Sequence, residues 1–335
     1  MTRFLCLLLV GLSLVAVGDM SGKSSSQEKG DPVERLLLSL GRRGVNVDDE
    51  LVDLNKLVVF KGEPERAKQL YDDIKARLEA KLKLAEDAPR TAPDNKLIAR
   101  ILAGGVRILA VTAHPDDENM MSGLLAFARD QGAPVLLLCL TRGEAGETAY
   151  AGESPGEALG RKRSEELRAA AEALGIDYKI AGFVNGAFKE KYPGKKFWLP
   201  GEVIAAWGGS RDPETVVAAE AEAFRPNIVV TIEPNWGWTG NPEHRAAAEL
   251  AKKAAARVSA EVVYAVTPDA VFTDEFDTAK RSSTKRGQTY WEVKVSAARQ
   301  HASQYKLPPD AEKHPEQFPD LSVEHFQAQA KVRLW

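Results

Sequence analysis

The sequence predicts an α/β protein with a mostly parallel, Rossmann-like sheet that has helices on both faces, preceded by a helical N-terminal extension. Two observations lead to this prediction. Nearly continuous apolar runs recur along the chain, as in VRILAVTA (106–113) and NIVVTIE (227–233), and such runs are typical of strands buried on both faces. Helical patterns separate these runs, and strands that alternate with helices indicate βαβ units and a parallel sheet.

Composition narrows the class of protein. The chain has 335 residues, of which 44% are hydrophobic and 28% are charged, as is usual for globular proteins. Its 45 Lys and Arg residues against 48 Asp and Glu residues give a net charge of −3. Because there is no basic excess, composition gives no support to a nucleic-acid partner. Two cysteines are too few for a disulfide framework.

Residues 1–18 are predicted to be a signal peptide. Arg3 precedes an apolar run over 4–18, and a charged start followed by a short apolar stretch is the pattern of such peptides. The run is short for a membrane span, which needs about 20 residues. We expect cleavage before Asp19 and a secreted or periplasmic protein without a stable membrane partner. An uncleaved, membrane-anchored form is the alternative.

Residues 19–100 are predicted to form a linker and then the helical extension. The segment 19–31 is polar and rich in small residues, which is typical of linkers. Apolar residues then recur at helical spacing between 67 and 85. Glu63-Pro64-Glu65 stands at the start of that helix, where acids and proline are favoured. We expect these helices to pack on the main domain, and their residues suggest no chemistry.

The main domain is predicted over residues 101–305, and residues 306–335 are left as a C-terminal tail without a predicted structure. Strands and helices alternate within the domain. The expected strands are 106–113, 134–140, 178–184, 227–233 and 261–266, and the expected helices are 119–131, 160–174, 213–224 and 242–258.

A histidine and three acids gather where the first predicted strand ends. The strand is followed by HPDDE (114–118), and open parallel sheets bind ligands at the carboxyl ends of their strands. Imidazole nitrogen and carboxylate oxygen are ordinary zinc ligands, so His114 and Asp117 can converge on one metal ion. Asp116 is then left beside the metal for proton transfer. A helix N-cap is the alternative role for one acid, and it leaves the histidine unexplained.

The segment AHPDDE after a first strand resembles the PIG-L/LmbE family of zinc-dependent N-deacetylases, which act on N-acetylglucosamine conjugates and related amines. The resemblance spans roughly residues 101–305 and implies an LmbE-like fold and a hydrolase of linear amide C–N bonds. Further segments resemble the family in the same order along the chain. They are LTRGEAGE (140–147), RSEE (163–166), NPEHRA (241–246), and a late segment from Lys294 to HASQ (301–304).

The resemblance implies roles for individual residues. His114, Asp117 and His244 match the three metal ligands, and Asp116 matches the general base. The implied cofactor is Zn²⁺, and Fe²⁺ fits the same ligands. A metal-activated water would attack the acetyl group of an N-acetylated sugar or glycoconjugate, so the expected partner is a small-molecule or glycan substrate.

Two departures from the family concern candidate substrate contacts. Asn241 stands where many members carry histidine, and Asn185 stands where others carry aspartate. Asparagine donates a hydrogen bond but does not deliver a proton, so acid catalysis falls to Asp116. Arg163 is a third candidate contact, with pairing to a nearby glutamate as the alternative. His301 is a candidate for orienting a metal ligand without touching the metal itself, with a buried histidine bonded to backbone as the alternative.

Two other classes of function are considered: the departures from the family pattern leave one of them open, and the motifs disfavour the other. A secreted metal- or sugar-binding protein of the same fold, with little or no turnover, is the main alternative to an enzyme. A dinucleotide binder is disfavoured, because Gly104-Gly105 precede the first strand instead of following it. The substrate and the oligomeric state stay open.

Overall fold

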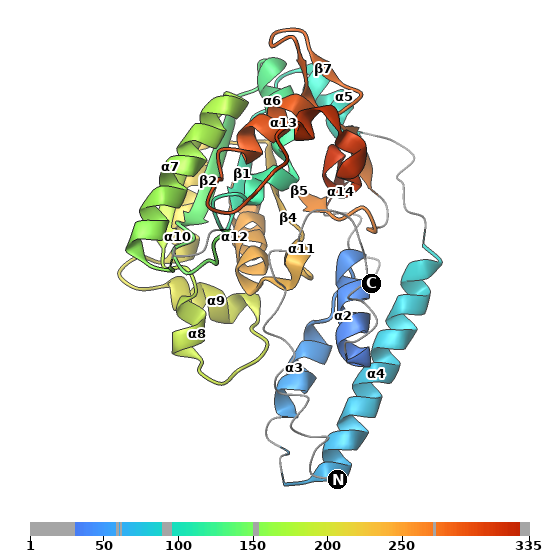
Figure 1. Ribbon diagram of the computed structural model, residues 1–335. Coiled ribbons are helices and arrows are strands. Elements are labelled where there is room, and N and C mark those ends of the chain that lie inside the picture. The colour runs from blue at the N-terminus through green and yellow to red at the C-terminus, as the bar shows by residue number, and fades with distance from the viewer. Residues whose placement is uncertain are drawn as a thin grey trace.

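The computed structural model describes residues 31–57, 60, 62–88, 96–149, 154–270 and 273–328. The predicted signal peptide, most of the predicted linker and the end of the predicted tail lie outside the described residues. In the described part, an α/β body carries a group of N-terminal helices that projects from it (Figure 1). No helix in these ranges is long and apolar enough to cross a membrane.

A seven-stranded sheet forms the centre of the body. Its strand order is β3-β2-β1-β4-β5-β9-β6, and β1 to β5 pair in parallel while β9 runs antiparallel to both of its neighbours. The mostly parallel sheet is therefore confirmed. The strands are β1 (Ile108–Thr112), β2 (Val135–Thr141), β3 (Asp177–Phe183), β4 (Ile228–Ile232), β5 (Glu261–Val266), β6 (Asp274–Asp277) and β9 (Val323–Ala328). A separate hairpin pairs β7 (Ser282–Ser283) with β8 (Gln288–Thr289).

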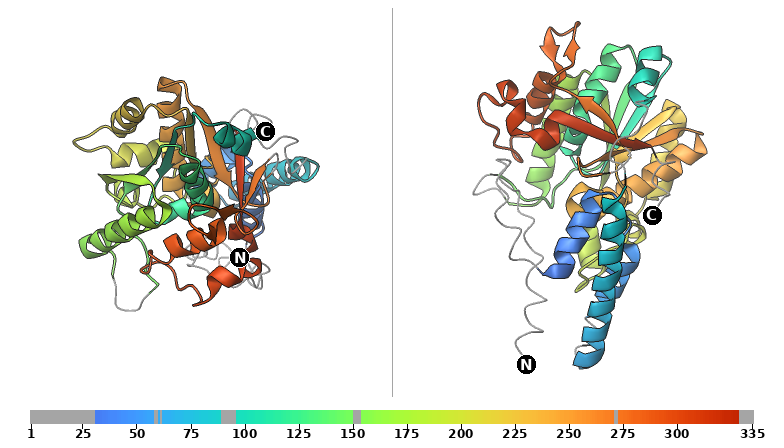
Figure 2. Two further views of the ribbon diagram at one scale, coloured as in Figure 1. Left: turned by 90° about the horizontal axis from the view of Figure 1, so that it is seen from above. Right: turned by 90° about the vertical axis from the view of Figure 1, so that its right-hand side faces the viewer.

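Each face of the sheet packs against its own layer of helices (Figure 2). Ile108 and Ala110 of β1 belong to one apolar layer, whereas Leu109 and Val111 belong to the other. All four are fully buried, which explains why the strand has no polar alternation. The first layer contains α5 (Lys96–Ala103), α6 (Ser122–Asp130), α7 (Glu157–Leu174) and α13 (Tyr290–Ala298); the second contains α8 (Ala187–Lys191), α9 (Pro200–Trp207), α10 (Pro213–Phe224) and α12 (Pro242–Arg257).

The predicted helical N-terminal extension is confirmed. It consists of α2 (Pro32–Arg42), α3 (Asp48–Lys56) and α4 (Pro64–Glu86), which we call the N-terminal helical unit. The unit has its own apolar cluster, in which Leu40, Ile74 and Leu78 are fully buried. The helices α2 and α4 run side by side (Figure 2).

The structure differs from the expected domain end at residue 305, because β9 comes from the predicted tail and lies between β5 and β6. Short turns of helix precede it: η2 (Ala311–Lys313), η3 (Pro315–Gln317) and α14 (Pro319–Ser322). The sequence VEHFQA lacks an apolar run because its buried positions include an ion pair. Glu324 accepts the N–H groups of Gly123 and Leu124 at 2.8 Å each, and it lies 2.6 Å from Nζ of Lys294.

We expect Glu324→Ala to destabilise the fold strongly. The substitution leaves Lys294, which is 3% exposed, without a counter-charge. Burial lowers the pKa of this lysine, and the charge of Glu324 opposes that decrease. Removing one partner of a buried pair costs about 3–5 kcal/mol. Urea unfolding measures the loss. The exposed Glu316→Ala is the control, expected within about 0.5 kcal/mol of the parent, and an equally small loss for Glu324→Ala would contradict the prediction.

Candidate metal centre

The candidate site lies at the carboxyl ends of the neighbouring strands β1 and β4. The chain passes from β1 to β2 on one side and from β4 to β5 on the other, and such a switch point opens a crevice at the sheet edge. The turn after β1 contains η1 (Asp117–Met120), so the predicted helix 119–131 begins as a tight turn before α6. The loop after β4 contains α11 (Gly237–Gly240) and leads into α12.

Three buried side chains from these segments converge on one point. His114, Asp117 and His244 offer ligand atoms that all lie within 4.8 Å of one another. Nδ1 of His114 lies 3.2 Å from Nε2 of His244, and that Nε2 lies 3.0 Å from Oδ1 of Asp117. The structure therefore brings together the three residues predicted as metal ligands.

In each of the two histidines, the ring nitrogen that faces away from the cluster contacts an oxygen atom of the protein. Nδ1 of His244 lies 2.7 Å from the carbonyl oxygen of Gly237. Nε2 of His114 lies 2.9 Å from Oε2 of Glu243. Histidines that bind metals are typically oriented by a carbonyl or carboxylate in this way, so both rings are already aligned as ligands.

The charges of the cluster suit a cation. Oδ2 of Asp117 accepts the N–H groups of Ala113 and His114 at 2.9 and 2.8 Å. Burial raises the pKa of Asp117, but His244 and His114 hold that pKa well below its usual range. Burial lowers the pKa of His114, yet Asp117 and Glu243 together raise it to about 10. A divalent cation can replace the proton that these carboxylates stabilise on His114, and two imidazoles with one carboxylate fit zinc.

Asp116 lies beside the cluster in a strained backbone conformation. Its φ is 105° and its ψ is −20°, a region that non-glycine residues rarely occupy outside functional sites. Its N–H donates to Oε2 of Glu118 at 3.0 Å, and its Oδ1 accepts from Arg163 at 3.0 Å. Burial raises the pKa of Asp116, and the charge of Arg163 opposes that rise. The carboxylate is thus mostly buried, with 16% of its side chain exposed, and it is held in place next to the predicted metal ligands.

Arg163 uses its donors inside the protein. The side chain is 3% exposed, and it donates to the carbonyl oxygens of Gly143 at 2.9 Å and Pro115 at 2.5 Å as well as to Asp116. Within the described part of the chain, its carboxylate partner is Asp116, whereas the alternative drawn from the sequence was a glutamate. Its role as a substrate contact stays a prediction.

His301 is fully buried and faces Glu118, not a backbone group. Its Nε2 contacts Oε1 of Glu118, whose other oxygen holds the N–H of Asp116. Nearby, Ser303 donates its N–H and its hydroxyl to Glu166 of α7 at 2.8 and 2.7 Å. The late segment therefore braces the turn of Asp116, and the contacts do not place His301 against a metal ligand.

Glu243 is the site residue that sequence reasoning missed. It is 2% exposed, and its Oε1 accepts from the N–H of Gly186 at 2.9 Å and from Nε1 of Trp207 at 3.0 Å. Its Oε2 faces His114 and accepts from Asn185. The available signal was an acid directly before a predicted ligand, which is easily taken for an ordinary acid at a helix start.

The two asparagines predicted as substrate contacts both support Glu243. Asn185 donates to its carboxylate and accepts the N–H of Ala145 at 2.9 Å. Asn241 is the N-cap of α12 and accepts the N–H of Glu243 at 2.9 Å. An aspartate at position 185 would instead place a second negative charge against Glu243. Direct contacts of these asparagines with substrate stay predictions.

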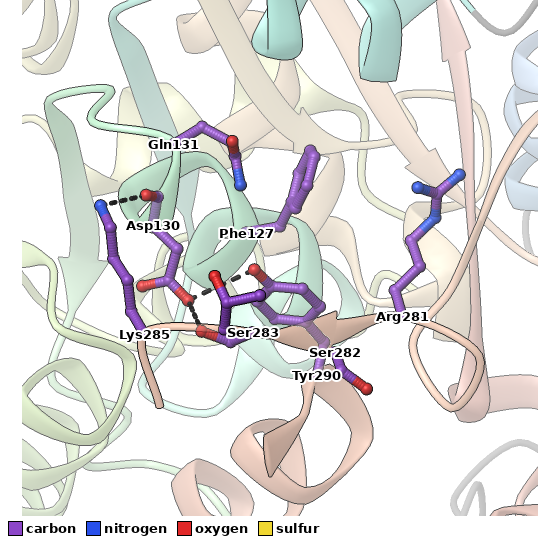
Figure 3. A pocket seen from close by; sticks show the side chains of 9 residues that line it. Phe127, Asp130, Gln131, Arg281, Ser282, Ser283, Lys285 and Tyr290 are labelled. Atoms are coloured by element: carbon purple, nitrogen blue, oxygen red, sulfur yellow. Dashed lines mark hydrogen bonds between the residues drawn. The ribbon is translucent and has the colours of Figure 1, made fainter. Parts of the chain in front are cut away.

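The pocket drawn in Figure 3 lies elsewhere, where α6 ends and the β7–β8 hairpin begins. Its volume is about 280 Å³, and its lining includes Phe127, Asp130 and Tyr290. Asp130 accepts from the hydroxyls of Ser283 at 2.6 Å and Tyr290 at 3.3 Å and from Arg286 at 3.0 Å. Its carboxylate is thus satisfied by neighbouring side chains at the opposite end of α6 from the metal cluster.

Comparison with known proteins agrees with the motifs. The family model described as PIG-L, GlcNAc-PI de-N-acetylase, matches residues 109–255. A 1D-myo-inositol 2-acetamido-2-deoxy-alpha-D-glucopyranoside deacetylase from Rhodococcus erythropolis is 32% identical over 220 residues, which cover 63% of this chain and 71% of the relative. The chain belongs to the PIG-L family. The resemblance stated from the motifs is therefore confirmed.

Other known proteins match over a shorter part of the chain or at lower sequence identity. A deacetylase of the same description from Kineococcus radiotolerans is 38% identical to this PIG-L protein over 156 residues. The match covers 41% of this chain and 41% of that relative, so it spans less than half of the relative's length. The solved structure of N,N'-diacetylchitobiose deacetylase from Pyrococcus horikoshii is 19% identical, with a TM-score of 0.43, and covers 70% of this chain and 91% of its own.

The zinc affinity of this PIG-L protein should rise as the pH is raised from about 6 to about 8. A ligand histidine must be neutral, whereas the pKa of His114 without metal is about 10. Below that pKa, zinc must displace a proton from His114, so the apparent zinc affinity falls by up to about tenfold for each pH unit that the pH is lowered. Calorimetric titration in buffers of different ionisation enthalpy counts the released proton. A pH-independent affinity would show the prediction wrong.

Glu243→Gln should weaken zinc binding about 10–100-fold, as changes to groups that orient metal ligands typically do. The amide removes the negative charge that faces Nε2 of His114. The matched control is Glu249→Gln on the same helix, where the side chain pairs with Lys252. Competition with a chromophoric chelator measures both affinities. Equal affinities of the two variants would exclude an orienting role for Glu243.

Proposed function

We propose that the protein is a zinc-dependent N-deacetylase that removes the acetyl group from an N-acetylated amino sugar within a glycoconjugate. The observation that carries this proposal is the buried convergence of His114, Asp117 and His244 beside Asp116 in a PIG-L chain. The names of the bacterial relatives support the substrate class, since both describe an acetylated glucosamine joined to inositol. Fe²⁺ would fit the same ligands, and zinc is the metal that we propose.

His114, Asp117 and His244 would hold the metal. A divalent cation there supplies Lewis acidity, which polarises the acetyl carbonyl and makes water more acidic. Asp116 accepts the proton of the attacking water as the new C–O bond forms. Its oxygen is held 3.0 Å from Arg163, so the base keeps one orientation through this step.

Collapse of the tetrahedral intermediate breaks the C–N bond once the nitrogen is protonated. Asp116 returns its proton to that nitrogen and so acts first as base and then as acid. Asn241 stands at the position of the family's histidine, but its oxygen already accepts the N–H of Glu243, and an amide delivers no proton. The products are acetate and a free amine.

We further propose that the protein is exported. The support is the sequence of residues 1–18, in which Arg3 precedes a short apolar run. N-terminal sequencing of the protein recovered outside the cytoplasm tests this proposal, with a mature chain that begins at Asp19 as the expected result. An intact first residue on cytoplasmic protein would contradict it.

Metal content and acetate release test the catalytic proposal together. The purified chain from Asp19 onward should hold about one equivalent of zinc, and His244→Ala should hold little. Asp116→Asn should keep its zinc while kcat falls about 10²–10⁴-fold, the usual contribution of a general base. Asp72→Asn, on the exposed side of α4, is the control with unchanged activity.

The substrates to offer are an N-acetylglucosaminyl inositol, N,N'-diacetylchitobiose and free N-acetylglucosamine. Zinc binding without acetate release from any of them would favour the metal- or sugar-binding alternative. Failure of the parent protein to bind zinc or iron would remove the metal site itself.

A further inference from the structure

The N-terminal helical unit lies outside the residues matched by the family model, which begin at residue 109. It nevertheless packs against the loop that follows β4 and leads to His244. In Figure 1, α2 lies next to α11 of this loop. We call residues 233–241 the ligand loop.

Two residues of the ligand loop are held directly by the N-terminal helical unit. The side chain of Asn235, which is 8% exposed, donates to the carbonyl oxygen of Gly44 and accepts from Asn46 at 3.3 Å. Trp236 packs into the apolar cluster of the unit. A Cβ atom added at Gly41 would overlap the indole of Trp236, so α2 and the ligand loop are in close contact at this point.

The same loop orients the third predicted metal ligand. The buried carboxylate of Glu233 accepts the N–H groups of Asn235 at 2.7 Å and of Trp236 and Trp238 at 3.0 Å. This fixes the loop around Gly237, whose carbonyl oxygen lies 2.7 Å from Nδ1 of His244. Gly237 has a φ of +70°, and an added Cβ would lie 2.9 Å from Cβ of His244.

A second connection reaches the residue after this ligand. Arg245 is 3% exposed, and its guanidinium pairs with Asp48 at the start of α3. Its Nε also donates to the carbonyl oxygen of Pro234 at 3.1 Å. One side chain thus links the unit, the ligand loop and the first turn of α12.

We propose that the N-terminal helical unit is a positioning element for His244. Through Asn235, Trp236 and Arg245 it holds the ligand loop in the conformation that aims the Gly237 carbonyl, and hence the His244 imidazole, at the metal. The inference rests on the proposed function, because it assigns the unit a part in metal binding. It makes Asn235 and Trp236 positioning residues that do not touch the metal.

The interface contains a matched control. Asn55 of the same unit donates to the carbonyl oxygen of Phe197 at 2.9 Å and accepts the N–H of Phe197 at 3.1 Å. Asn55→Ala therefore removes two hydrogen bonds between the unit and the body, as Asn235→Ala does, but away from the ligand loop. A role limited to stability would make the two variants alike in zinc affinity.

Gly41→Ala supplies a second, independent variant. Gly41 lies within α2, where alanine is intrinsically favoured over glycine. If the unit were only a cap, this substitution would leave zinc affinity unchanged. If the proposal holds, the new methyl group displaces Trp236 and weakens zinc binding.

The experiment measures zinc affinity of the full mature chain by chelator competition, with thermal melting as the check on folding. We expect Asn235→Ala and Gly41→Ala to lose at least about tenfold in zinc affinity, the lower end of what disturbing outer groups costs, and Asn55→Ala to stay within about twofold of the parent. With sugar substrate at saturating zinc, Asn235→Ala and Gly41→Ala should both regain most of their kcat, because Asp116 is untouched.

The outcomes separate this inference from the proposed function. Tight zinc binding by the parent, with equal affinities in Asn235→Ala, Gly41→Ala and Asn55→Ala, would overturn the positioning role and leave the metal site intact. A parent chain that binds no zinc would overturn the metal site and the positioning role together. If Asn235→Ala fails to fold, the comparison of Gly41→Ala with Asn55→Ala decides the question alone.

Discussion

The contact between His114 and Glu243 is the interaction on which the rest of the site depends. It joins the turn after β1 to the first turn of α12, two segments separated by 129 positions in the chain. Glu243 in turn receives hydrogen bonds from Asn185, Gly186 and Trp207. A buried carboxylate with this many donors keeps its charge, and that charge fixes the imidazole. The first and third predicted metal ligands therefore meet because one acid joins the two segments that carry them.

This network also gives a physical reason for the departures from the family pattern. Asn185 and Asn241 both lie against Glu243, one as a donor to its carboxylate and the other as the cap of its N–H. An acidic residue at 185 would repel Glu243, and a neutral amide avoids that cost. The two asparagines are thus compatible with the predicted metal site, and in the proposed mechanism the proton transfer falls to Asp116.

Much of the fold and the cluster of candidate metal ligands could be predicted, because both depend on short, local sequence patterns. Apolar runs locate β1, β2, β4 and β5 within two residues at each end, and the two histidine motifs predict the cluster that the structure brings together. Strand β9 could not be predicted, because Glu324 is buried as an ion pair and the strand carries no apolar run. Glu243 was missed because an acid at a helix start usually has a local role. In both cases the role of the glutamate depends on partners that are distant in the sequence.

The ligand loop shows why a domain of this kind benefits from an extension. Trp238 has a φ of +64° and a ψ of −52°, and Glu233 is buried, which raises its pKa against the opposing backbone N–H groups. Strained backbone and buried charge persist only where surrounding contacts leave no easier arrangement. The sheet supplies contacts on one side of the loop, and the N-terminal helical unit supplies Gly44, Asn46 and Asp48 on the other. In the proposed arrangement, the packing of the extension adds to the hydrogen bonds that Glu233 accepts within the loop, and together they hold the Gly237 carbonyl in place.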